Sequence, residues 1–332
     1  MSILLAKSKD YKEIILFINK YYVKNHILVK NKKLFDNFYK NNQNYNLLIY
    51  RENNKIISIL GFINYSKYSK NRTTNLIWLA LWASKHNSYG AGLKLLKNLE
   101  NKFKNCSIIG LGLTDKALLI LKMIDYKINH LNHYYLTNAK LKKFKIIKRP
   151  AKNNYIKSNN SLLLKKLTNL EFKKIDFNTK NKYKNKNYFI NKYYKNKFYK
   201  YNFYFIKNNS NSNFIILICR TISVRRINII RIIEIIGDSK ILRNSYYALQ
   251  SILNNNQAEY IDCLNYGIPK SHFFSGGFKE IQNGTIVPNY FEPFKSKSKK
   301  IYFAYKKNKY IEKKLNIFKG DGDQERPNKI RE

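Results

Sequence analysis

The sequence is poor in cysteine, proline and glycine. Its 332 residues include three Cys, five Pro and 12 Gly, which excludes a disulfide-stapled scaffold, a collagen-like repeat and a proline-rich linker protein. The cysteines Cys106, Cys219 and Cys263 are far apart and form no Cys-x-x-Cys pair, so we expect free, buried thiols in a reducing compartment. The five His show no metal-ligand spacing, and we predict no metal site.

Long uninterrupted apolar runs are also missing. The most apolar long stretch, residues 214–236, carries four Arg and one Glu, which is too much charge for a membrane span. Lys7, Lys9 and Asp10 interrupt any apolar core of an N-terminal signal peptide. We therefore expect a soluble, cytoplasmic protein without a transmembrane segment.

Acidic residues are scarce beside basic ones. The chain has 64 Lys and Arg against 20 Asp and Glu, a formal net charge of +44. Such charge attracts polyanions, so a basic nucleic-acid-binding or ribosome-associated protein is one candidate class. However, Lys, Asn, Ile and Tyr are enriched together and all have A/T-rich codons, so genome composition alone is the alternative source of the charge. No recognition motif is present, and we expect no specific nucleic-acid partner.

What the sequence does contain is a long alternation of strands and helices. Hydrophobic residues make up 44% of the chain, enough for two domains with sizeable cores. Residues 1–138 predict a strand, two helices, a hairpin, a strand, a helix, a strand, a helix and a last strand over residues 133–136. After a basic linker at residues 139–160, the order recurs less clearly over residues 161–306. There we expect a helix over residues 162–172 and a closing strand over residues 301–305.

The most informative stretch is residues 76–103. A near-continuous apolar run predicts a buried strand, a short polar loop follows, and Gly90-Ala91-Gly92 opens a helix with a leucine face. Glycines allow close backbone approach, and the free N–H groups and dipole of a helix N-terminus favour phosphate oxygens. A tight turn without a ligand is the alternative reading of Gly-x-Gly.

With these residues, the first half resembles the GNAT superfamily of N-acetyltransferases. In that family a splayed strand precedes a loop of the form Arg/Gln-x-x-Gly-x-Gly/Ala that binds the coenzyme A pyrophosphate. The corresponding residues here are Asn87, Tyr89, Gly90, Ala91 and Gly92. Asn87 replaces the usual Arg or Gln, and Leu121 lies near the position of the family's general-acid Tyr. The resemblance implies an α/β fold with two GNAT-like units, each a mostly antiparallel sheet flanked by helices, with a splayed strand pair in the first.

The second half looks like a diverged copy. Gly237-Asp238 stands where the phosphate loop belongs, without Gly-x-Gly, so the resemblance implies one live acyl-CoA site, in the first unit. Residues 288–294 and the Asp-Gly-Asp-Gln-Glu-Arg-Pro-Asn segment within residues 307–332 are similar to acyltransferase-like proteins of bacterial surface-polysaccharide gene clusters. The implied activity is transfer of an acyl group, in the first place acetyl from acetyl-CoA, to a small amine such as an amino sugar. A catalytically inactive tandem fold serving as an interaction module is a further alternative.

Acyl transfer needs a polarised thioester carbonyl and an acceptor for the amine's proton. We expect the backbone at Trp82, Ala83 and Ser84 to provide the first, although an ordinary strand end is the alternative. Candidates for the proton-handling residue are Glu259, Asp262, His272 and Tyr134, each of which also has a structural reading. Asp262 and Glu259 are three apart on one predicted strand, so at most one of them faces a shared cleft.

The C-terminal segment concentrates acids in a Lys-rich chain. Asp321, Asp323 and Arg326 are candidate acceptor-binding residues, and we expect the segment to close over an acceptor bound between the units. A solvated chain end is the alternative. The Asp-x-Asp spacing is half of a calcium loop, but the closing Glu is missing.

Overall fold

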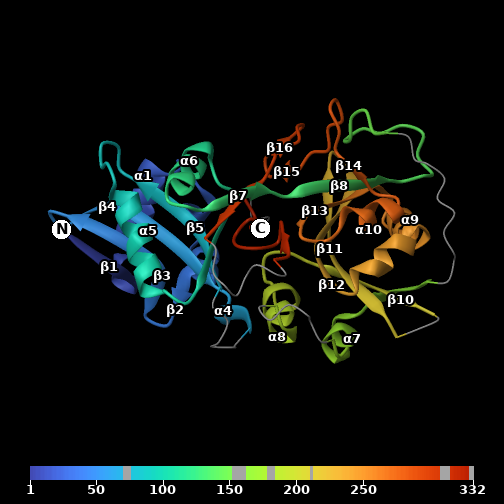
Figure 1. Cartoon of the computed structure of the whole chain (residues 1–332), viewed down its shortest axis with the longest axis horizontal. Coiled ribbons are helices and arrows are strands. Elements are labelled where there is room, and N and C mark those ends of the chain that lie inside the picture. The colour runs from blue at the N-terminus through green and yellow to red at the C-terminus, as the bar shows by residue number, and fades with distance from the viewer. Residues whose placement is uncertain (70–75, 152–161, 178–183, 210–211, 307–314, 329–332) are drawn as a thin grey trace. The chain divides into compact units, whose positions relative to one another are not determined.

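A computed structural model of the chain describes residues 1–69, 76–151, 162–177, 184–209, 212–306 and 315–328 (Figure 1). Parts of the expected basic linker (152–160) and C-terminal segment (307–314 and 329–332) lie outside these residues. The chain folds as two compact units. The first comprises Met1–Asn129, Ile301–Lys313 and Asp321–Glu332, and the second comprises His130–Lys300 and Lys314–Gly320.

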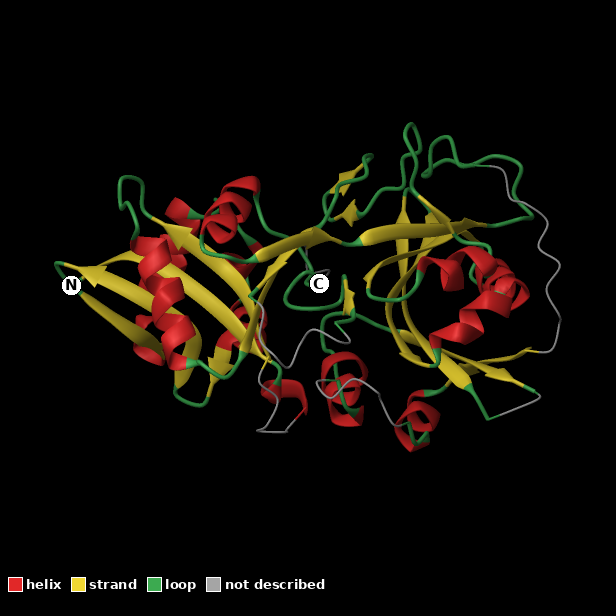
Figure 2. Cartoon of the chain, in the orientation of Figure 1, coloured by secondary structure: helices red, strands yellow, loops and turns green. Residues whose placement is uncertain are grey.

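The first unit is an eight-stranded sheet with helices on both faces (Figure 2). Its strand order is β1-β3-β4-β5-β6-β17-β7, and β2 pairs with β3. The strands are β1 (Ser2–Lys7), β2 (Lys40–Asn41), β3 (Asn44–Glu52), β4 (Lys55–Asn64), β5 (Leu76–Ser84), β6 (Ser107–Leu111), β7 (Lys127–His130) and β17 (Tyr302–Tyr305). The helices are η1 (Ser8–Asp10), α1 (Tyr11–Tyr21), α2 (Ile27–Lys30), α3 (Lys32–Tyr39), α4 (Ser66–Ser69), α5 (Ala91–Lys102) and α6 (Asp115–Met123).

The second unit has its own eight-stranded sheet, in the order β14-β8-β13-β12-β11-β10-β9, with β18 paired to β13. Its strands are β8 (Asn132–Thr137), β9 (Leu162–Leu167), β10 (Asn202–Asn208), β11 (Phe214–Val224), β12 (Ile227–Gly237), β13 (Ala258–Tyr266), β14 (Lys279–Glu280) and β18 (Ile317–Phe318), beside a small hairpin of β15 (Tyr290–Phe291) and β16 (Phe294–Lys295). The helices are α7 (Asn169–Lys174), α8 (Lys186–Phe189), η2 (Ile190–Tyr194), η3 (Ser239–Asn244), α9 (Tyr246–Asn255) and α10 (Lys270–Ser275).

The predicted fold class, two mostly antiparallel sheets flanked by helices, is confirmed. Two strands, however, lie in a different sheet from the one expected. β8, expected to end the first unit, pairs with β13 (Tyr134 opposite Cys263), and β17, expected to close the second, pairs with β6 (Ala304 opposite Gly110). Alternating apolar residues identify a strand but not its distant neighbour. The units are consequently discontinuous and differ from the expected segments 1–138, 161–306 and 307–332.

One predicted element is wrong in type. The stretch 162–172, expected as a single helix, is strand β9 followed by α7. Thr168 ends the strand and begins the helix, because its side chain and that of Glu171 form a capping box. The run Leu162-Leu163-Leu164 satisfies both a helical and an extended pattern, so periodicity alone did not separate the two.

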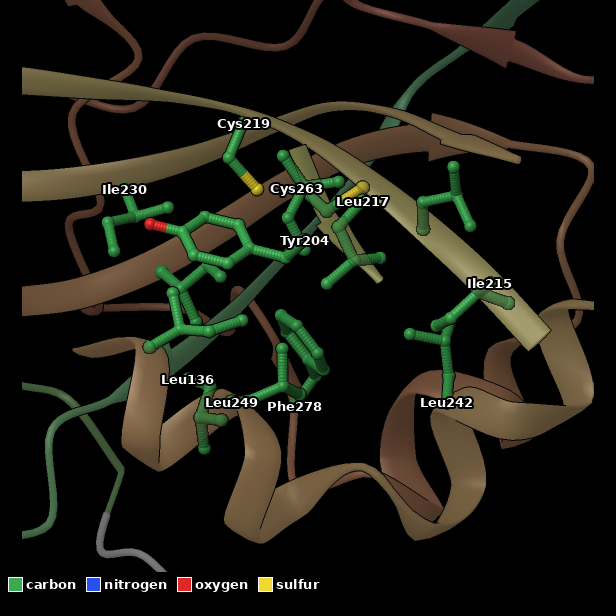
Figure 3. Close-up of a cluster of buried hydrophobic side chains, with 14 of the residues drawn as sticks. Leu136, Tyr204, Ile215, Leu217, Cys219, Ile230, Leu242, Leu249, Cys263 and Phe278 are labelled. Atoms are coloured by element: carbon green, nitrogen blue, oxygen red, sulfur yellow. The ribbon is translucent and has the colours of Figure 1, made fainter. Parts of the chain in front are cut away.

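Each unit has its own apolar core. In the first unit α5 packs across β3, β4 and β5 through Leu95, Leu96 and Leu99, which are fully buried. In the second unit η3 and α9 contribute Leu242 and Leu249 to the cluster drawn in Figure 3. Cys219 and Cys263 lie in that cluster as free thiols, as expected, whereas Cys106 is free and half-buried.

Candidate active site

The central strands of the first unit separate at the middle of the sheet. β5 and β6 run parallel, and their pairing extends from Leu76 opposite Ser107 to Leu79 opposite Gly110. β5 then continues to Ser84, whereas β6 ends at Leu111. Beyond Leu79 no strand among the described residues pairs with this edge of β5. The first unit therefore contains the predicted splayed strand pair, which leaves backbone groups of β5 available.

A β-bulge lies at the point where the strands separate. In the β4–β5 pairing Leu60 is opposite Trp82 and Phe62 is opposite Leu79, so β5 has one extra residue here. The side chains agree with this register, because Leu79 and Trp82 both pack in the cluster under α5 although they are three positions apart. A bulge leaves a residue unpaired in the ladder. The extra residue falls at Ala80–Leu81, just before Trp82, Ala83 and Ser84, where the sequence predicts the polarising backbone group.

Trp82, Ala83 and Ser84 lie in regular pairing with β4. They are opposite Leu60, Ile59 and Ser58, respectively. The Ser58 hydroxyl donates to the carbonyl of Ala83 and lies 2.8 Å from the hydroxyl of Ser84. These contacts fix the end of β5 and so the start of the loop that leads to α5.

The loop and the helix start have the backbone that an anion site requires. Asn87 and Gly90 both have positive φ (64° and 74°), and Gly90 directly precedes α5 with no side chain capping the helix. A Cβ at Gly90 would meet nothing within 4 Å, so the backbone here is open. Tyr89 is 90% exposed. The N–H of Ala91 donates to the carbonyl of Ser88, so the N–H groups of Gly92 and Leu93 are those of the first turn that can meet an outside acceptor.

Gly92 has a different role from Gly90. A Cβ at Gly92 would lie 2.7 Å from Nε1 of Trp82, so only glycine lets the start of α5 pack directly on the indole. Ala91 between them is buried against the core. The two glycines thus set, respectively, the turn into the helix and the close packing of the helix on β5.

The described end of the C-terminal segment belongs to the first unit, and its residues 321–327 are buried or half-buried. Asp321 is fully buried and accepts a hydrogen bond from the hydroxyl of Tyr65, while Asp323, 5% exposed, pairs with Arg326. A solvated chain end is therefore contradicted for these residues. The sequence alone does not show whether this segment is buried, because a polar terminal segment has no periodicity from which burial can be inferred.

Glycines show where this segment crosses the sheet. A Cβ at Gly322 would lie 3.6 Å from the ring of Trp78, two residues before the bulge. The side chain of Gln324 fills the space beside Gly112, immediately after β6 ends. The segment thus passes from β5 to the end of β6 beside the point where the two strands separate, and its carboxylates lie near that point.

His26 joins this polar cluster as a neutral group. Its Nδ1 accepts the backbone N–H of Leu28 in the first turn of α2, and its Nε2 lies 3.4 Å from Nη2 of Arg326. Burial, and then the positive charge of Arg326, lower the pKa of His26 to about 4. His26 is therefore uncharged at neutral pH, and the charged groups beside it are Arg326 and its ion-pair partner Asp323.

The four proton-handling candidates all lie in the second unit. Glu259, 3% exposed, accepts the backbone N–H groups of Lys145, Ile146 and Ile147 at 2.7–2.8 Å. Through these bonds the Glu259 carboxylate attaches residues 145–147, in the segment that follows β8, to strand β13. Three N–H donors to one buried carboxylate are typical of a structural anchor.

Asp262 is held by a buried ion pair. Arg231 on β12 donates to it through Nε and Nη2 at 2.9 and 2.6 Å, and Nε2 of His133 lies 2.8 Å away. Burial alone would raise the pKa of Asp262, but the guanidinium of Arg231 and the hydrogen bond with His133 bring it down to about 2. A carboxylate this acidic is a poor proton acceptor near neutral pH.

His272 and Tyr134 also have close neighbours in the second unit. Nδ1 of His272 lies 3.1 Å from the hydroxyl of Ser239, and burial, followed by the charge of Arg243, lowers its pKa. The ring of Tyr134 stacks on Phe273 at 4.0 Å within the core. Tyr134 therefore has the packing role that we had given as its alternative.

The second unit also has a separated strand pair, but its own chain fills the gap. β12 and β13 pair only as far as Ile232 opposite Cys263. Beyond this point β18 pairs with β13, and the N–H of Lys319 donates to the carbonyl of Leu264. A Cβ at Gly320 would lie 3.0 Å from the carbonyl oxygen of Ile233 on β12, so residues 317–320 occupy the gap next to the point where the two strands separate.

At the expected phosphate-loop position of the second unit, the helix start is already capped by a side chain. Gly237 has a positive φ of 97°, and a Cβ there would meet the Phe214 carbonyl. The side chain of Asp238 accepts the N–H of Lys240 at the start of the short η3 helix, so a carboxylate occupies the place that an anion would take.

Within the described ranges, no cluster of His, Cys, Asp or Glu is arranged to hold a metal ion. Nor does any described helix have the length and hydropathy to cross a membrane.

The comparisons with known proteins agree with this architecture. The sequence matches no protein-family model, and it matches no curated protein. By structure it is similar to a GCN5-related N-acetyltransferase from Anabaena variabilis, with 9% identity, a TM-score of 0.55 and coverage of 91% of this chain and 72% of that chain. A conserved protein from Enterococcus faecalis (7% identity, TM-score 0.55, 92% and 72% covered) and a GCN5-related N-acetyltransferase from Kribbella flavida (7%, 0.50, 92% and 70%) are similar over the same extent. The chain therefore has the two-unit fold of GCN5-related N-acetyltransferases.

Proposed function

We propose that the protein is an acyl-CoA-dependent N-acyltransferase and that the first unit carries its single cofactor site. The observation that supports this most directly is the uncapped N-terminus of α5, which follows an open Gly90 at the end of a splayed, bulged strand. A pyrophosphate at this helix start accepts backbone N–H bonds and gains from the helix dipole. Asn87, Tyr89, Gly90, Ala91 and Gly92 are the residues we assign to it.

The acyl thioester then belongs in the gap between β5 and β6. An unpaired backbone N–H at Ala80–Leu81 is suited to polarise the thioester carbonyl. The amine nitrogen of the acceptor attacks the carbonyl carbon, the C–S bond breaks, and the sulfur leaves as the thiol after taking up the proton that the nitrogen sheds. The products are an amide and coenzyme A.

For the acceptor side we propose the C-terminal segment. Asp321, Asp323 and Arg326 lie beside the strand separation, where two carboxylates against one guanidinium suit an amine or sugar hydroxyls. We assign no proton transfer to Glu259 or Asp262, because their oxygen atoms are engaged by backbone N–H groups and by Arg231. An amino sugar of a surface glycan is the acceptor that we propose.

A coupled thiol-release assay tests this function. The full-length protein is incubated with acetyl-CoA and, separately, with glucosamine, other amino sugars, amino acids and polyamines, and free thiol is followed while mass spectrometry identifies the product. We expect amine-dependent thiol release with an N-acetylated amino sugar as product. Transfer to another class of amine would overturn the amino-sugar assignment alone, whereas a protein that neither binds nor consumes acetyl-CoA would overturn the function itself.

A further inference from the structure

Tyr39, at the end of α3, carries a buried hydroxyl without a partner. Its side chain is fully buried, and its Oη makes no hydrogen bond to any described residue. Leaving such a donor unsatisfied costs roughly 1–3 kcal/mol, so buried hydroxyls are almost always paired.

The ring of Tyr39 lies over the bulge. A Cβ at Gly61 would be 2.8 Å from Cε1 of Tyr39 and 3.2 Å from Cβ of Leu81, so Gly61 is the residue that makes room for the ring. Gly61 lies between Leu60 and Phe62, opposite the extra residue of β5. The ring of Tyr39 therefore lies beside Gly61 and the Cβ of Leu81, next to the bulge, and its hydroxyl is on the ring carbon bonded to Cε1.

The neighbours of this hydroxyl keep it in its protonated form. Burial, and then the negative charge of Asp323, raise the pKa of Tyr39 well above its ordinary value. The hydroxyl is therefore protonated at neutral pH and can act as a donor. The acceptor nitrogen of His26, Nδ1, already binds the N–H of Leu28, and the guanidinium of Arg326 has only donors, so neither group offers Tyr39 an acceptor.

We propose that Tyr39 is a catalytic residue whose hydroxyl, together with the backbone N–H at the bulge, donates a hydrogen bond to the carbonyl oxygen of the acyl thioester. The inference rests on the proposed function. When the amine adds to the carbonyl carbon, the π electron pair moves onto this oxygen, and the two donors stabilise the resulting negative charge. When the C=O bond re-forms and the sulfur leaves as the thiol with the proton shed by the nitrogen, Tyr39 still holds its own proton. This role differs from that of the family's general-acid Tyr, near whose position Leu121 lies.

Tyr39→Phe tests the proposal because it removes one oxygen atom and no protein hydrogen bond. We expect an unchanged or higher melting temperature, unchanged acetyl-CoA affinity, and a fall in kcat with an accepted probe amine on the order of 10²–10³-fold. The matched control is Tyr45→Phe. Tyr45 is equally buried, but its hydroxyl donates to Asp36 at 3.1 Å, so this change should lower the melting temperature and leave kcat unchanged.

A spectroscopic readout makes the test independent of the acceptor. With [1-¹³C]acetyl-CoA bound to the wild-type protein, hydrogen bonding should move the carbonyl resonance to higher frequency than in free acetyl-CoA. Tyr39→Phe should return the resonance part of the way, and Tyr45→Phe should not. Equal carbonyl shifts in Tyr39→Phe and the wild-type protein, or equal turnover, would overturn the role of Tyr39. Absence of any acetyl-CoA binding to the wild-type protein would overturn the proposed function instead.

Discussion

Gly90→Val separates a cofactor role of the loop from a purely structural one. Gly90 has φ 74°, and its Cβ position is open, so a valine there is strained by its backbone and not by collisions. The strain should cost about 1–2 kcal/mol of stability. The added side chain would also stand in front of the first-turn N–H groups. Losing two hydrogen bonds to a charged pyrophosphate, each worth roughly 1.5–3 kcal/mol, should weaken acetyl-CoA binding about 100-fold or more.

Gly284→Val is the matched control for this experiment. Gly284 lies in the second unit with φ 87° and an equally open Cβ position, so valine meets the same backbone strain there. Calorimetric titration of both variants with acetyl-CoA, together with thermal melts, gives affinity and stability separately. We expect similar losses of stability but a loss of affinity in Gly90→Val only. Equal affinities in the two variants would show that the helix start is not the pyrophosphate site.

Two further predictions concern the buried charges. The pKa of Asp262 is about 2 in the folded protein against an ordinary 3.8, which corresponds to about 2 kcal/mol of folding stability. This stability is fully present above pH 4 and is lost as the pH falls through 2. The acid denaturation of Asp262→Asn should lack this pH-dependent component. At pH 7 the same variant leaves Arg231 without its carboxylate and should lose about 3–5 kcal/mol in chemical denaturation, and an unchanged midpoint would refute this reading of the pair. Asp323→Asn should raise the KM for the acceptor while leaving acetyl-CoA affinity unchanged, and an unaltered kcat/KM would remove Asp323 from the acceptor side.

The local elements of the fold were largely predictable from the sequence. The apolar run of β5 and the helix after Gly90 are local patterns, and both lie where expected. The exchange of β8 and β17 between the two sheets was not predictable, because pairing partners far apart in sequence leave no mark on the periodicity of either strand. β18, which fills the strand gap of the second unit, is only two residues long and is too short for any pattern.

The site residues divide in the same way. Gly90 and Gly92 were identified because turn geometry and close packing require glycine itself. Glu259 and Asp262 were named for their carboxylates alone, and only the structure shows the backbone N–H groups and the Arg231 guanidinium that occupy them. Tyr39 shares the buried face of α3 with Leu34, Phe35 and Phe38, and nothing in that pattern distinguishes it from them. Its missing hydrogen-bond partner is a property of the packed structure.

The stoichiometry of acetyl-CoA binding tests the central claim most directly. The first unit offers an open helix start beside a separated strand pair, whereas in the second unit β18 and Gly320 fill the corresponding gap. Isothermal titration of the full-length protein should therefore give one acetyl-CoA per chain. Two sites per chain, or no binding at all, would contradict the account.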